Sequence, residues 1–364
     1  MARGRKGELR RGWTTGACAT AAVRAAAEAL LTGRFPDPVT ISLPRGQRPS
    51  FALARAELDG GRATAGVVKD AGDDPDVTHG ALVLATVTRG PRGSGVRFRA
   101  GEGIGTVTRP GLTLAVGEPA INPAPRRMME AAVAEVVAAH GAAGEPGDLE
   151  ITVSIPGGEE LAKKTTNARL GIVGGLSVLG TTGVVIPYSC ASWVHSIHRG
   201  IDVARAAGLT HIAAATGRTS ERAAQRLYGL DDVALIDMGD FAGGTLKYLR
   251  RHPVPWLTLA GGFAKLSKLA AGHLDLHSAR SRVEVQELAG MLEELGAESH
   301  VAGAARAAAS AGEVLALAEA HAVPLAERVA CRGREVALAA LGGETAVDVV
   351  VFDRAGRLLG RAGP

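Results

Sequence analysis

The sequence has only three cysteines, Cys18, Cys190 and Cys331, and they lie far apart along the chain. This odd number without a CxxC pair argues against a disulfide framework. The cysteines and histidines also lack the spacing of a zinc site. Such cysteine usage fits a reducing compartment, so we expect a cytoplasmic protein.

Aromatic residues make up only 3% of the chain, and Lys+Arg (41) nearly balances Asp+Glu (37). Nucleic-acid binding is typically indicated by a basic stripe interleaved with aromatic side chains, and this sequence has none. We therefore expect no nucleic-acid partner. The small net charge of +4 leaves two interpretations open, a solvated surface or attraction to a polyanionic small molecule.

Long apolar runs are also missing, so we expect no membrane-spanning segment and no membrane partner. The N-terminus is basic, but residues 12–16 are glycine, tryptophan and threonine rather than the apolar core of a signal peptide. The next apolar stretch, residues 17–31, carries Arg24 and Glu28, as a helix of a water-soluble protein does.

Glycine, by contrast, is abundant, with 49 residues among 364. A chain of this length suggests two domains. The Gly-, Ala- and Pro-rich stretch at residues 140–148 is the best linker candidate. We place one domain at 1–145 and the other at 146–364, and allow for the second to be intertwined with the first.

The first half mixes helices and strands, which predicts an α+β domain. Thr14 or Thr15 is placed to cap its first helix and Gly33 to end it. Apolar periodicity and β-branched residues predict helices at 19–31 and 126–140 and strands at 39–43, 81–88, 96–100, 106–108 and 150–155.

In the second half, short apolar strands alternate with helices, which predicts an α/β domain built on a largely parallel sheet. The expected strands are 211–215, 233–238, 255–259 and 346–352. The expected helices begin near Ser220, end at Arg251, follow Gly262, and cover 284–295 and 303–320.

Two segments of the first half are candidates for binding or acid–base chemistry. Thr14 and Thr15 open a helix, where free N–H groups and hydroxyls attract anions, although a simple cap explains them too. Cys18 beside them is expected to be a small buried residue rather than a nucleophile.

The second segment is acidic, with four carboxylates at residues 70–76 followed by a histidine. The spacing does not match an EF-hand, and Asp residues also favour turns. We keep both a turn and a base or sulfonium-binding role open for Asp70, Asp73, Asp74 and His79.

The glycine-rich segment at 101–106 lacks the context of a dinucleotide loop, because β-branched residues and Pro110 follow it instead of a helix. It predicts a turn whose backbone approaches something closely. We retain Gly101, Gly103 and Gly105 as cofactor-binding candidates on that ground.

Cationic residues stand at two places where they need an anionic partner. Arg126 and Arg127 lie at a helix start, where the dipole disfavours cations, so a neighbouring acid or a ligand carboxylate is expected. Lys163, Lys164 and Arg169 lie among glycines and either clamp carboxylates or belong to a charged helix turn.

In the second half, three turns follow strands and precede helices, and they converge on one edge of a parallel sheet, where ligands bind. The cofactor-binding candidates there are Gly217, Arg218, Thr219, Gly239 and Asp240. The third turn is 261–265, from Gly261 to Lys265. His273, Asp275 and His277 alternate beyond it, and they indicate either a metal site or ordinary surface or core histidines.

Taken together and in order, these segments resemble the cobalt-precorrin-5B (C1)-methyltransferase family. The resemblance covers most of the chain up to about residue 299 and only loosely the tail. It is carried by GWTTGACATAA (12–22), KDAGDDPDVTHG (69–80), GEGIGTVTRPGL (101–112), GEPAINPAPR (117–126), IPGGEELAKKTTNARLGIVGGLSVLGTTG (155–183), TGRTSE (216–221) and GGFAKLSKLAAGHLDLHS (261–278).

The resemblance implies transfer of the methyl group of S-adenosylmethionine to C1 of a cobalt-containing tetrapyrrole, in the oxygen-independent route to cobalamin. The cobalt arrives in the substrate, so no metal bound by the protein itself is required. Because the substrate carries several carboxylates, Thr14, Thr15, Arg126, Arg127, Lys163, Lys164 and Arg169 become the substrate-binding candidates.

Two other functions stay open as alternatives. A non-catalytic tetrapyrrole carrier would keep the basic clamps without a cofactor site. Another nucleotide-using enzyme would hold phosphates at the helix start of residues 14–16. A homo-oligomer is compatible with the glycine-rich segments, which pack equally well against a second subunit.

Overall fold

The computed structural model describes residues 9–141 and 147–364 in two compact units, residues 1–189 and 190–364. The strand β9 (Leu149–Ser154) lies after the expected boundary at 145/146 but pairs with strands of the first unit. The division of the chain therefore falls later, after Ser189. Residues 1–8, with most of the basic N-terminus, and residues 142–146 of the expected linker lie outside the described residues.

The first unit is the mixed α+β unit that the sequence predicts. Its other elements are β1 (Gly12–Trp13), α1 (Thr15–Thr32), β2 (Val39–Thr40), β3 (Ser50–Phe51), β4 (Arg55–Asp59), β5 (Arg62–Val68), β6 (Leu82–Arg89), β7 (Val96–Ala100), β8 (Thr106–Val107), α2 (Pro123–His140), α3 (Gly158–Ala162), β10 (Ile172–Val173) and β11 (Val184–Val185).

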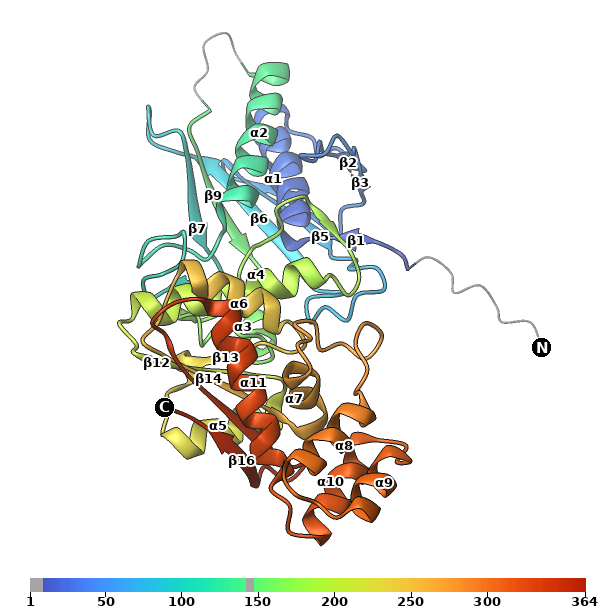
Figure 1. Cartoon of the computed structure of the whole chain (residues 1–364). Helices are drawn as coiled ribbons and strands as arrows, with labels where there is room; N and C mark the ends of the chain where they lie inside the picture. The colour runs from blue at the N-terminus through green and yellow to red at the C-terminus, as the bar shows by residue number, and fades with distance from the viewer. Residues whose placement is uncertain (1–8, 142–146) are drawn as a thin grey trace, which may run out of the picture. The chain divides into compact units, whose positions relative to one another are not determined.

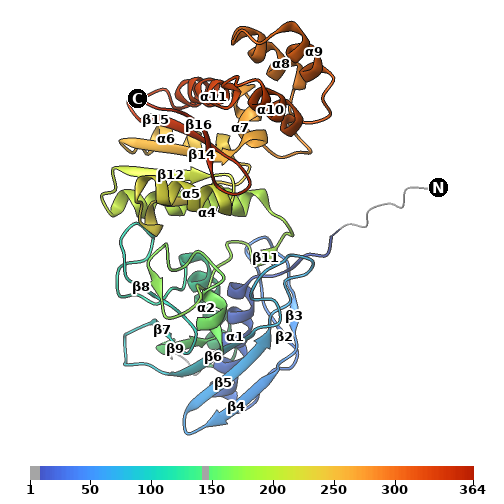
Figure 2. The same ribbon diagram turned by 90° about the horizontal axis from the view of Figure 1, so that it is seen from below.

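A five-stranded sheet with the order β4-β5-β6-β9-β7 forms the body of this unit. Its pairings are antiparallel except for β7 with β9, because the chain returns through α2 before β9 enters the sheet. Helices α1 and α2 lie side by side against one face (Figures 1 and 2). The strand expected at 39–43 is only two residues long, and β4 and β5 were not anticipated.

Alanine makes the close packing of α1 possible. Eight of the buried residues of α1 are alanines, and the helix is buried nearly all round. It lies on the sheet face formed by Ala63, Ala65 and Val67 of β5 and their partners on β6. Thr14 caps the helix and Gly33 ends it in the left-handed conformation, as predicted.

The second unit is the α/β unit that the sequence predicts. Its elements are α4 (Cys190–Ala206), β12 (His211–Ala215), α5 (Arg218–Tyr228), a 3₁₀ turn (Asp232–Ala234), β13 (Leu235–Asp237), α6 (Ala242–Arg251), β14 (Trp256–Gly262), α7 (Phe263–Ala270), α8 (Val285–Glu294), α9 (Ser299–Arg306), α10 (Ala311–Ala320), α11 (Leu325–Leu341), β15 (Ala346–Phe352) and β16 (Leu358–Ala362).

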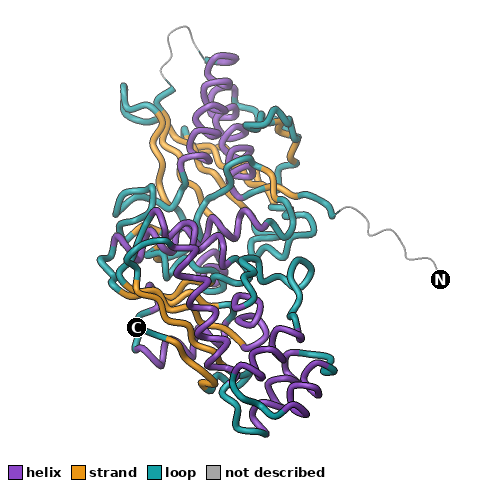
Figure 3. The backbone as a smooth tube through the Cα atoms, in the orientation of Figure 1, coloured by secondary structure: helices purple, strands orange, loops and turns teal. Residues whose placement is uncertain are grey.

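The sheet of this unit has the order β13-β12-β14-β15-β16, with all pairs parallel except the last. Helix α5 packs on one face, and α6, α7 and α11 pack on the other. Helices α8, α9 and α10 pack on one another beside α7 (Figure 3). The single helix expected at 303–320 is two helices, because Ser310 caps α10 after a break. Helices α4 and α11 and strand β16 were missed.

A buried carboxylate joins three strands of this sheet, β14, β15 and β16, to α5. Asp348 on β15 is fully buried and accepts hydrogen bonds from the Tyr228 hydroxyl, from Thr258 (2.5 Å) and from Trp256 Nε1 (3.1 Å). Arg361 of β16 lies 3.6 Å away. Burial, followed by the hydrogen bond to Asp348, raises the pKa of Tyr228. The hydrogen-bonding capacity of this buried carboxyl group is therefore satisfied within the protein.

Within the described residues, no helix is long and apolar enough to cross a membrane.

We predict that Asp348→Ala lowers the free energy of unfolding by about 3 kcal/mol or more, because three buried donors lose their acceptor. Urea unfolding followed by circular dichroism measures the change. The control is Glu335→Ala, since Glu335 makes only an exposed pair with Arg332. Equal midpoints for the two variants would contradict the role given to Asp348.

Candidate functional site

Three segments of the first unit that are distant in the sequence lie against one another, and we call residues 10–16, 69–80 and 179–188 the loop cluster. The Trp13 N–H donates to the Asp70 carbonyl (2.7 Å), and the Gly16 N–H donates to the Leu179 carbonyl (3.0 Å). The Tyr188 N–H donates to Asp74 Oδ1 (2.9 Å). The cluster thus joins three of the segments that carry the resemblance.

The start of α1 is covered by the protein itself. Thr14 Oγ1 accepts the Ala17 N–H (3.2 Å), and the Leu179 carbonyl accepts the Gly16 N–H. Thr14 and Thr15 are only 6% and 4% exposed. Their predicted contact with substrate finds no support here, and a phosphate would meet a helix start at which the Gly16 and Ala17 N–H groups already have acceptors.

Cys18, in the first turns of the same helix, behaves as the sequence predicts. It is completely buried, and burial raises the pKa of its thiol to about 12. A thiol that stays protonated at neutral pH is a poor nucleophile.

Arg10 holds one end of the acidic segment. Its guanidinium donates to both oxygens of Asp70, one of them at 2.9 Å, and its backbone N–H donates to Asp73 Oδ2 (2.6 Å). The hydrogen bond from Arg10, followed by that from the Gly72 N–H, lowers the pKa of Asp70 to about 2. Gly72 must be glycine, because its φ is +68° and a Cβ would lie 2.2 Å from the Arg10 carbonyl oxygen.

Asp74 holds a strained tyrosine. Tyr188 has a φ of 54°, in the left-handed region that bulky residues avoid, and its side chain is 68% exposed. The hydrogen bond from its N–H to Asp74 stabilises this conformation. An exposed ring kept in an unfavourable backbone conformation is a feature found at ligand-binding sites.

His79 is positioned as a donor. Its Nδ1 accepts the Ala71 N–H (3.1 Å) and lies 3.9 Å from Asp70 Oδ1. In the neutral ring the proton is therefore on Nε2. His79 fits a hydrogen-bond donor better than the general base that the sequence suggested.

The ion pair of Lys69 and Asp76 anchors this segment, and it was not predicted from the sequence. Lys69 is 1% exposed, and its Nζ lies 2.5 Å from Asp76 Oδ2. The other oxygen of Asp76 accepts the Thr78 N–H (2.7 Å) and hydroxyl (2.6 Å). Burial raises the pKa of Asp76, but the Lys69 charge and these hydrogen bonds outweigh it and leave the pKa below its ordinary value.

A signal for this pair was present in the sequence. Residues 63, 65 and 67 are the buried apolar positions of β5, and alternation places Lys69 on the same face. A lysine at a buried strand position needs a carboxylate partner.

The glycines at 101–105 are used by the fold. A Cβ at Gly101 would lie 2.0 Å from Ser154 Oγ, and one at Gly103 would lie 2.0 Å from the Ile155 carbonyl oxygen. At Gly105 it would lie 2.5 Å from Ile172. The close approach that the sequence predicts is thus to the protein's own chain, and this explains the three glycines without a cofactor.

Arg126 has protein partners. Its guanidinium donates to the carbonyls of Ile121 (2.8 Å) and Pro119 (3.2 Å), and lies 3.4 Å from Glu118. Of the two expectations for its anion, the neighbouring acid is the one found.

The remaining cations of the first unit divide into engaged and available side chains. Lys163 pairs with Glu160 (2.5 Å) in α3, and Arg169 is half-buried. The side chains of Arg127 and Lys164 are exposed and make no hydrogen bond or ion pair with the residues that the structure describes. These two are the candidates free to meet a carboxylate.

The second unit brings its predicted turns to one edge, because β12, β13 and β14 are parallel. Helices α5 and α7 leave β12 and β14 on opposite faces, which places a topological switch point between these two strands. Gly217 and Gly262 start these helices without a side-chain cap, and a Cβ at Gly217 would meet nothing within 4 Å. Arg218 and Thr219 beside Gly217 are exposed.

Beyond β13, the turn holding Gly239 and Asp240 is lined by a tryptophan. Trp193 of α4 donates to the Asp237 carbonyl (3.1 Å) and is 47% exposed, and a Cβ at Gly239 would touch its ring at 3.4 Å. Asp240 pairs with Lys265 of α7. Trp193 was not predicted, and Lys265 belongs to the third predicted turn, although its pairing with Asp240 was not predicted.

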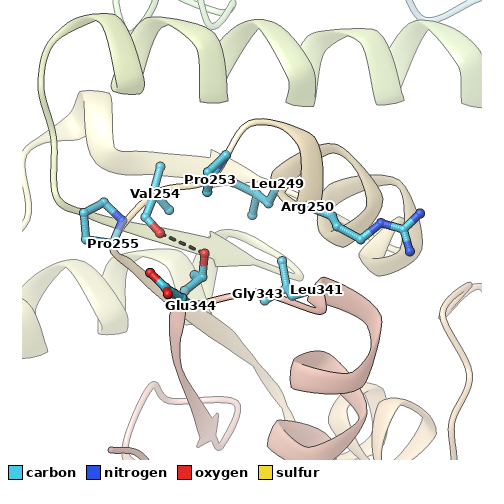
Figure 4. Close-up of a pocket in the computed structure, with 9 residues that line it drawn as sticks. Leu249, Arg250, Pro253, Val254, Pro255, Leu341, Gly343 and Glu344 are labelled. Carbon is cyan, nitrogen blue, oxygen red and sulfur yellow. Dashed lines mark hydrogen bonds between the residues drawn. The ribbon is translucent and has the colours of Figure 1, made fainter.

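Two other features of the second unit are a cavity and the segment of the expected metal site. A cavity of about 520 Å³ lies at the amino ends of β14 and β15, lined by Arg250, Pro253 and Glu344 among others (Figure 4). It is at the end of the sheet opposite the switch point. Asp275 pairs with Arg280 (2.8 Å), and no group of three metal-binding side chains occurs in the described ranges.

Comparison with known proteins gives one consistent result. The family model CbiD matches residues 2–187, and the model CbiD, C-terminal domain, matches residues 275–363. A cobalt-precorrin-5B C(1)-methyltransferase of Paramagnetospirillum magneticum is 60% identical, covering 97% of this chain and 98% of the relative. That of Rhodospirillum rubrum is 60% identical, covering 98% of each.

A crystal structure of the cobalamin biosynthesis protein (cbiD) from Archaeoglobus fulgidus is 30% identical. The matched part covers 75% of this chain and 83% of the Archaeoglobus fulgidus chain, with a TM-score of 0.40.

We predict that Arg10→Ala raises the pKa of Asp70 from about 2 toward its ordinary 3.8. With Arg10 in place, the folded carboxyl is more acidic than the unfolded one. Its stabilising contribution is therefore present above pH 3.8 and lost as the pH falls toward 2. Carbon-13 NMR titration of labelled aspartates measures the pKa. Arg55→Ala, which breaks the exposed pair with Glu57, is the control and should leave Asp70 unchanged.

Proposed function

The chain belongs to the CbiD family, and we propose that it catalyses the reaction for which its relatives are named, methylation of C1 of cobalt-precorrin-5B, with S-adenosylmethionine as donor and cobalt-precorrin-6A as product. The observation that carries this conclusion is identity of about 60% over nearly the full length of both chains. Both units therefore have counterparts in these methyltransferases.

The donor site that the geometry favours is the switch point of the second unit. Ligands of open α/β sheets bind beyond the carboxyl ends of the strands at such a point. Gly217 leaves open space there, and the exposed Arg218 and Thr219 follow it. Trp193 offers an aromatic face beside Gly239. When bound, S-adenosylmethionine supplies an activated methyl group, so these residues need only hold and orient it.

The loop cluster of the first unit is the corresponding candidate for the tetrapyrrole. The ring system is large and flat, and Tyr188, Ile186 and Leu179 are apolar side chains at least 50% exposed on one segment of the cluster. Arg127 and Lys164 are available in the same unit to pair with its carboxylates.

The reaction forms a bond between C1 and the methyl carbon and breaks the bond from that methyl to sulfur, whose electron pair stays on sulfur. Any proton that the ring gives up needs a base. Asp73 and Asp74 each use one oxygen for a backbone N–H and, among the described residues, keep the other free. They are our candidates for this role, ahead of Asp70, whose two oxygens are held by Arg10.

The proposed function is tested by turnover of the purified protein with S-adenosylmethionine and cobalt-precorrin-5B. We expect the tetrapyrrole to gain one methyl group, with an equal amount of S-adenosylhomocysteine. Tetrapyrrole binding without S-adenosylhomocysteine would instead support a carrier. Preference for a nucleotide over S-adenosylmethionine would support the third function, which the covered start of α1 already disfavours.

We predict that Tyr188→Gly weakens tetrapyrrole binding about tenfold, because an aromatic contact is lost while glycine accepts the left-handed backbone. Tyr188→Phe keeps the ring and should bind as the unmodified protein does. Fluorescence titration measures the tetrapyrrole Kd, and S-adenosylmethionine binding should not change in either variant. Unchanged tetrapyrrole affinity in Tyr188→Gly would remove this residue from the site.

A further inference from the structure

Two lysines of α7 point their ammonium groups at one oxygen atom. Lys265 Nζ lies 3.2 Å from the Leu276 carbonyl oxygen, and Lys268 Nζ lies 3.0 Å from the same oxygen. The two nitrogens can therefore be no farther apart than the sum of these distances. The segment 272–277 crosses α7 here and also receives the Gly243 N–H at the Leu274 carbonyl (2.7 Å).

The charges of this cluster do not balance. Lys265 pairs with Asp240, but Lys268 is only 6% exposed and the carbonyl is its one hydrogen-bond acceptor among the described residues. The nearby Asp275 is engaged with Arg280 (2.8 Å) and with the His277 N–H (3.1 Å). Burial, followed by the charge of Lys265, lowers the pKa of Lys268.

Three ammonium N–H groups are left for another acceptor. Each lysine has three donors, of which Lys265 uses two and Lys268 uses one. A buried cation with a single neutral acceptor is costly, and a second anion would offset that cost. A hydrogen bond that only fixes the Leu276 carbonyl in the fold needs one neutral donor. Such a structural role does not explain why two ammonium groups meet at this oxygen.

The cluster lies where an anion of a ligand would arrive. Lys265 is in the first turn of α7, at the carboxyl end of β14, and its side chain is 34% exposed. The helix start at Gly262 has no side-chain cap, and its dipole also favours negative charge. Asp240 belongs to the turn after β13, at the same edge of the sheet.

We propose that Lys265 and Lys268 form a carboxylate-binding site at the carboxyl edge of the second unit's sheet, with Lys265 in contact with the ligand and Lys268 as a positioning charge behind it. The proposal rests on the proposed function, which names two reactants with carboxylates. One source is the amino-acid end of S-adenosylmethionine, and the other is a side chain of the tetrapyrrole.

The test uses substitutions that keep the hydrogen bond but remove the charge. Lys265→Gln and Lys268→Gln remove the charge but keep an N–H donor, so a role limited to a neutral hydrogen bond would change ligand affinity little. The matched control is Lys247→Gln on α6, an exposed lysine of the same unit. Thermal unfolding of each variant shows that it is folded, and Lys268→Arg, which keeps the charge, should retain binding.

Calorimetry with the full chain gives the Kd of S-adenosylmethionine, its decarboxylated analogue and cobalt-precorrin-5B. If the carboxylate is that of the donor, the analogue binds about tenfold more weakly than S-adenosylmethionine, and both glutamine variants abolish this preference. If it is that of the tetrapyrrole, the variants weaken only cobalt-precorrin-5B, by a similar factor.

Unchanged affinity for both ligands in both glutamine variants overturns the proposal. These binding measurements do not depend on methyl transfer. A protein that binds S-adenosylmethionine with this carboxylate preference but yields no methylated product would keep the lysine site and lose the proposed function. Methyl transfer by the protein, with unaltered affinities in the glutamine variants, would support the proposed function and overturn the lysine site.

Discussion

The loop cluster depends on the ion pair between the buried Lys69 and the half-buried Asp76. A lysine that is 1% exposed is stable only with a partner, and Asp76 supplies the carboxylate at 2.5 Å. Because Asp76 also accepts both donors of Thr78, the pair joins the end of β5 to the far end of the acidic segment. This ion pair therefore helps to hold the carboxylates between Lys69 and Asp76 at defined positions.

From this ion pair the loop cluster extends to the two ends of the first unit. Arg10 and Tyr188 lie near its beginning and end, and each contacts the acidic segment through a hydrogen bond to an aspartate. The segment thus has mainly a structural role at Asp70 and Asp76 and retains chemical freedom at Asp73 and Asp74. A run of acids that looks uniform in sequence is divided by its hydrogen bonds into two kinds of residue.

The second unit uses a different principle, the alignment of parallel strands. Every parallel strand ends at the same edge, so short turns after β12, β13 and β14 meet without any long-range motif. Glycines at the helix starts leave that edge open, whereas the space beside the glycines at 101–105 of the first unit is occupied by the protein's own side chains and backbone. The same residue type thus marks an open edge in one unit and a dense interior in the other.

The order of residues along the chain was sufficient to predict many of the helices and strands and to indicate the family. Alternation and helix capping predicted α1, β6, β7 and the strands β12 to β15 of the second unit, since these depend on neighbours a few residues away. They failed for α11, and at 303–320 they merged two helices, because nothing in the periodicity marked the break before Ser310. The ordered motifs indicated the methyltransferase family, which the relatives bear out.

Only the folded chain decided which polar residues are free. Arg126 and Arg127 are adjacent and alike in sequence, yet one is held by three groups of its own loop and the other is exposed. Lys268 appeared as an ordinary helical lysine until the fold placed it beside Lys265 at a single carbonyl. Such partners are set by contacts between distant segments, and periodicity along the chain carries no record of them.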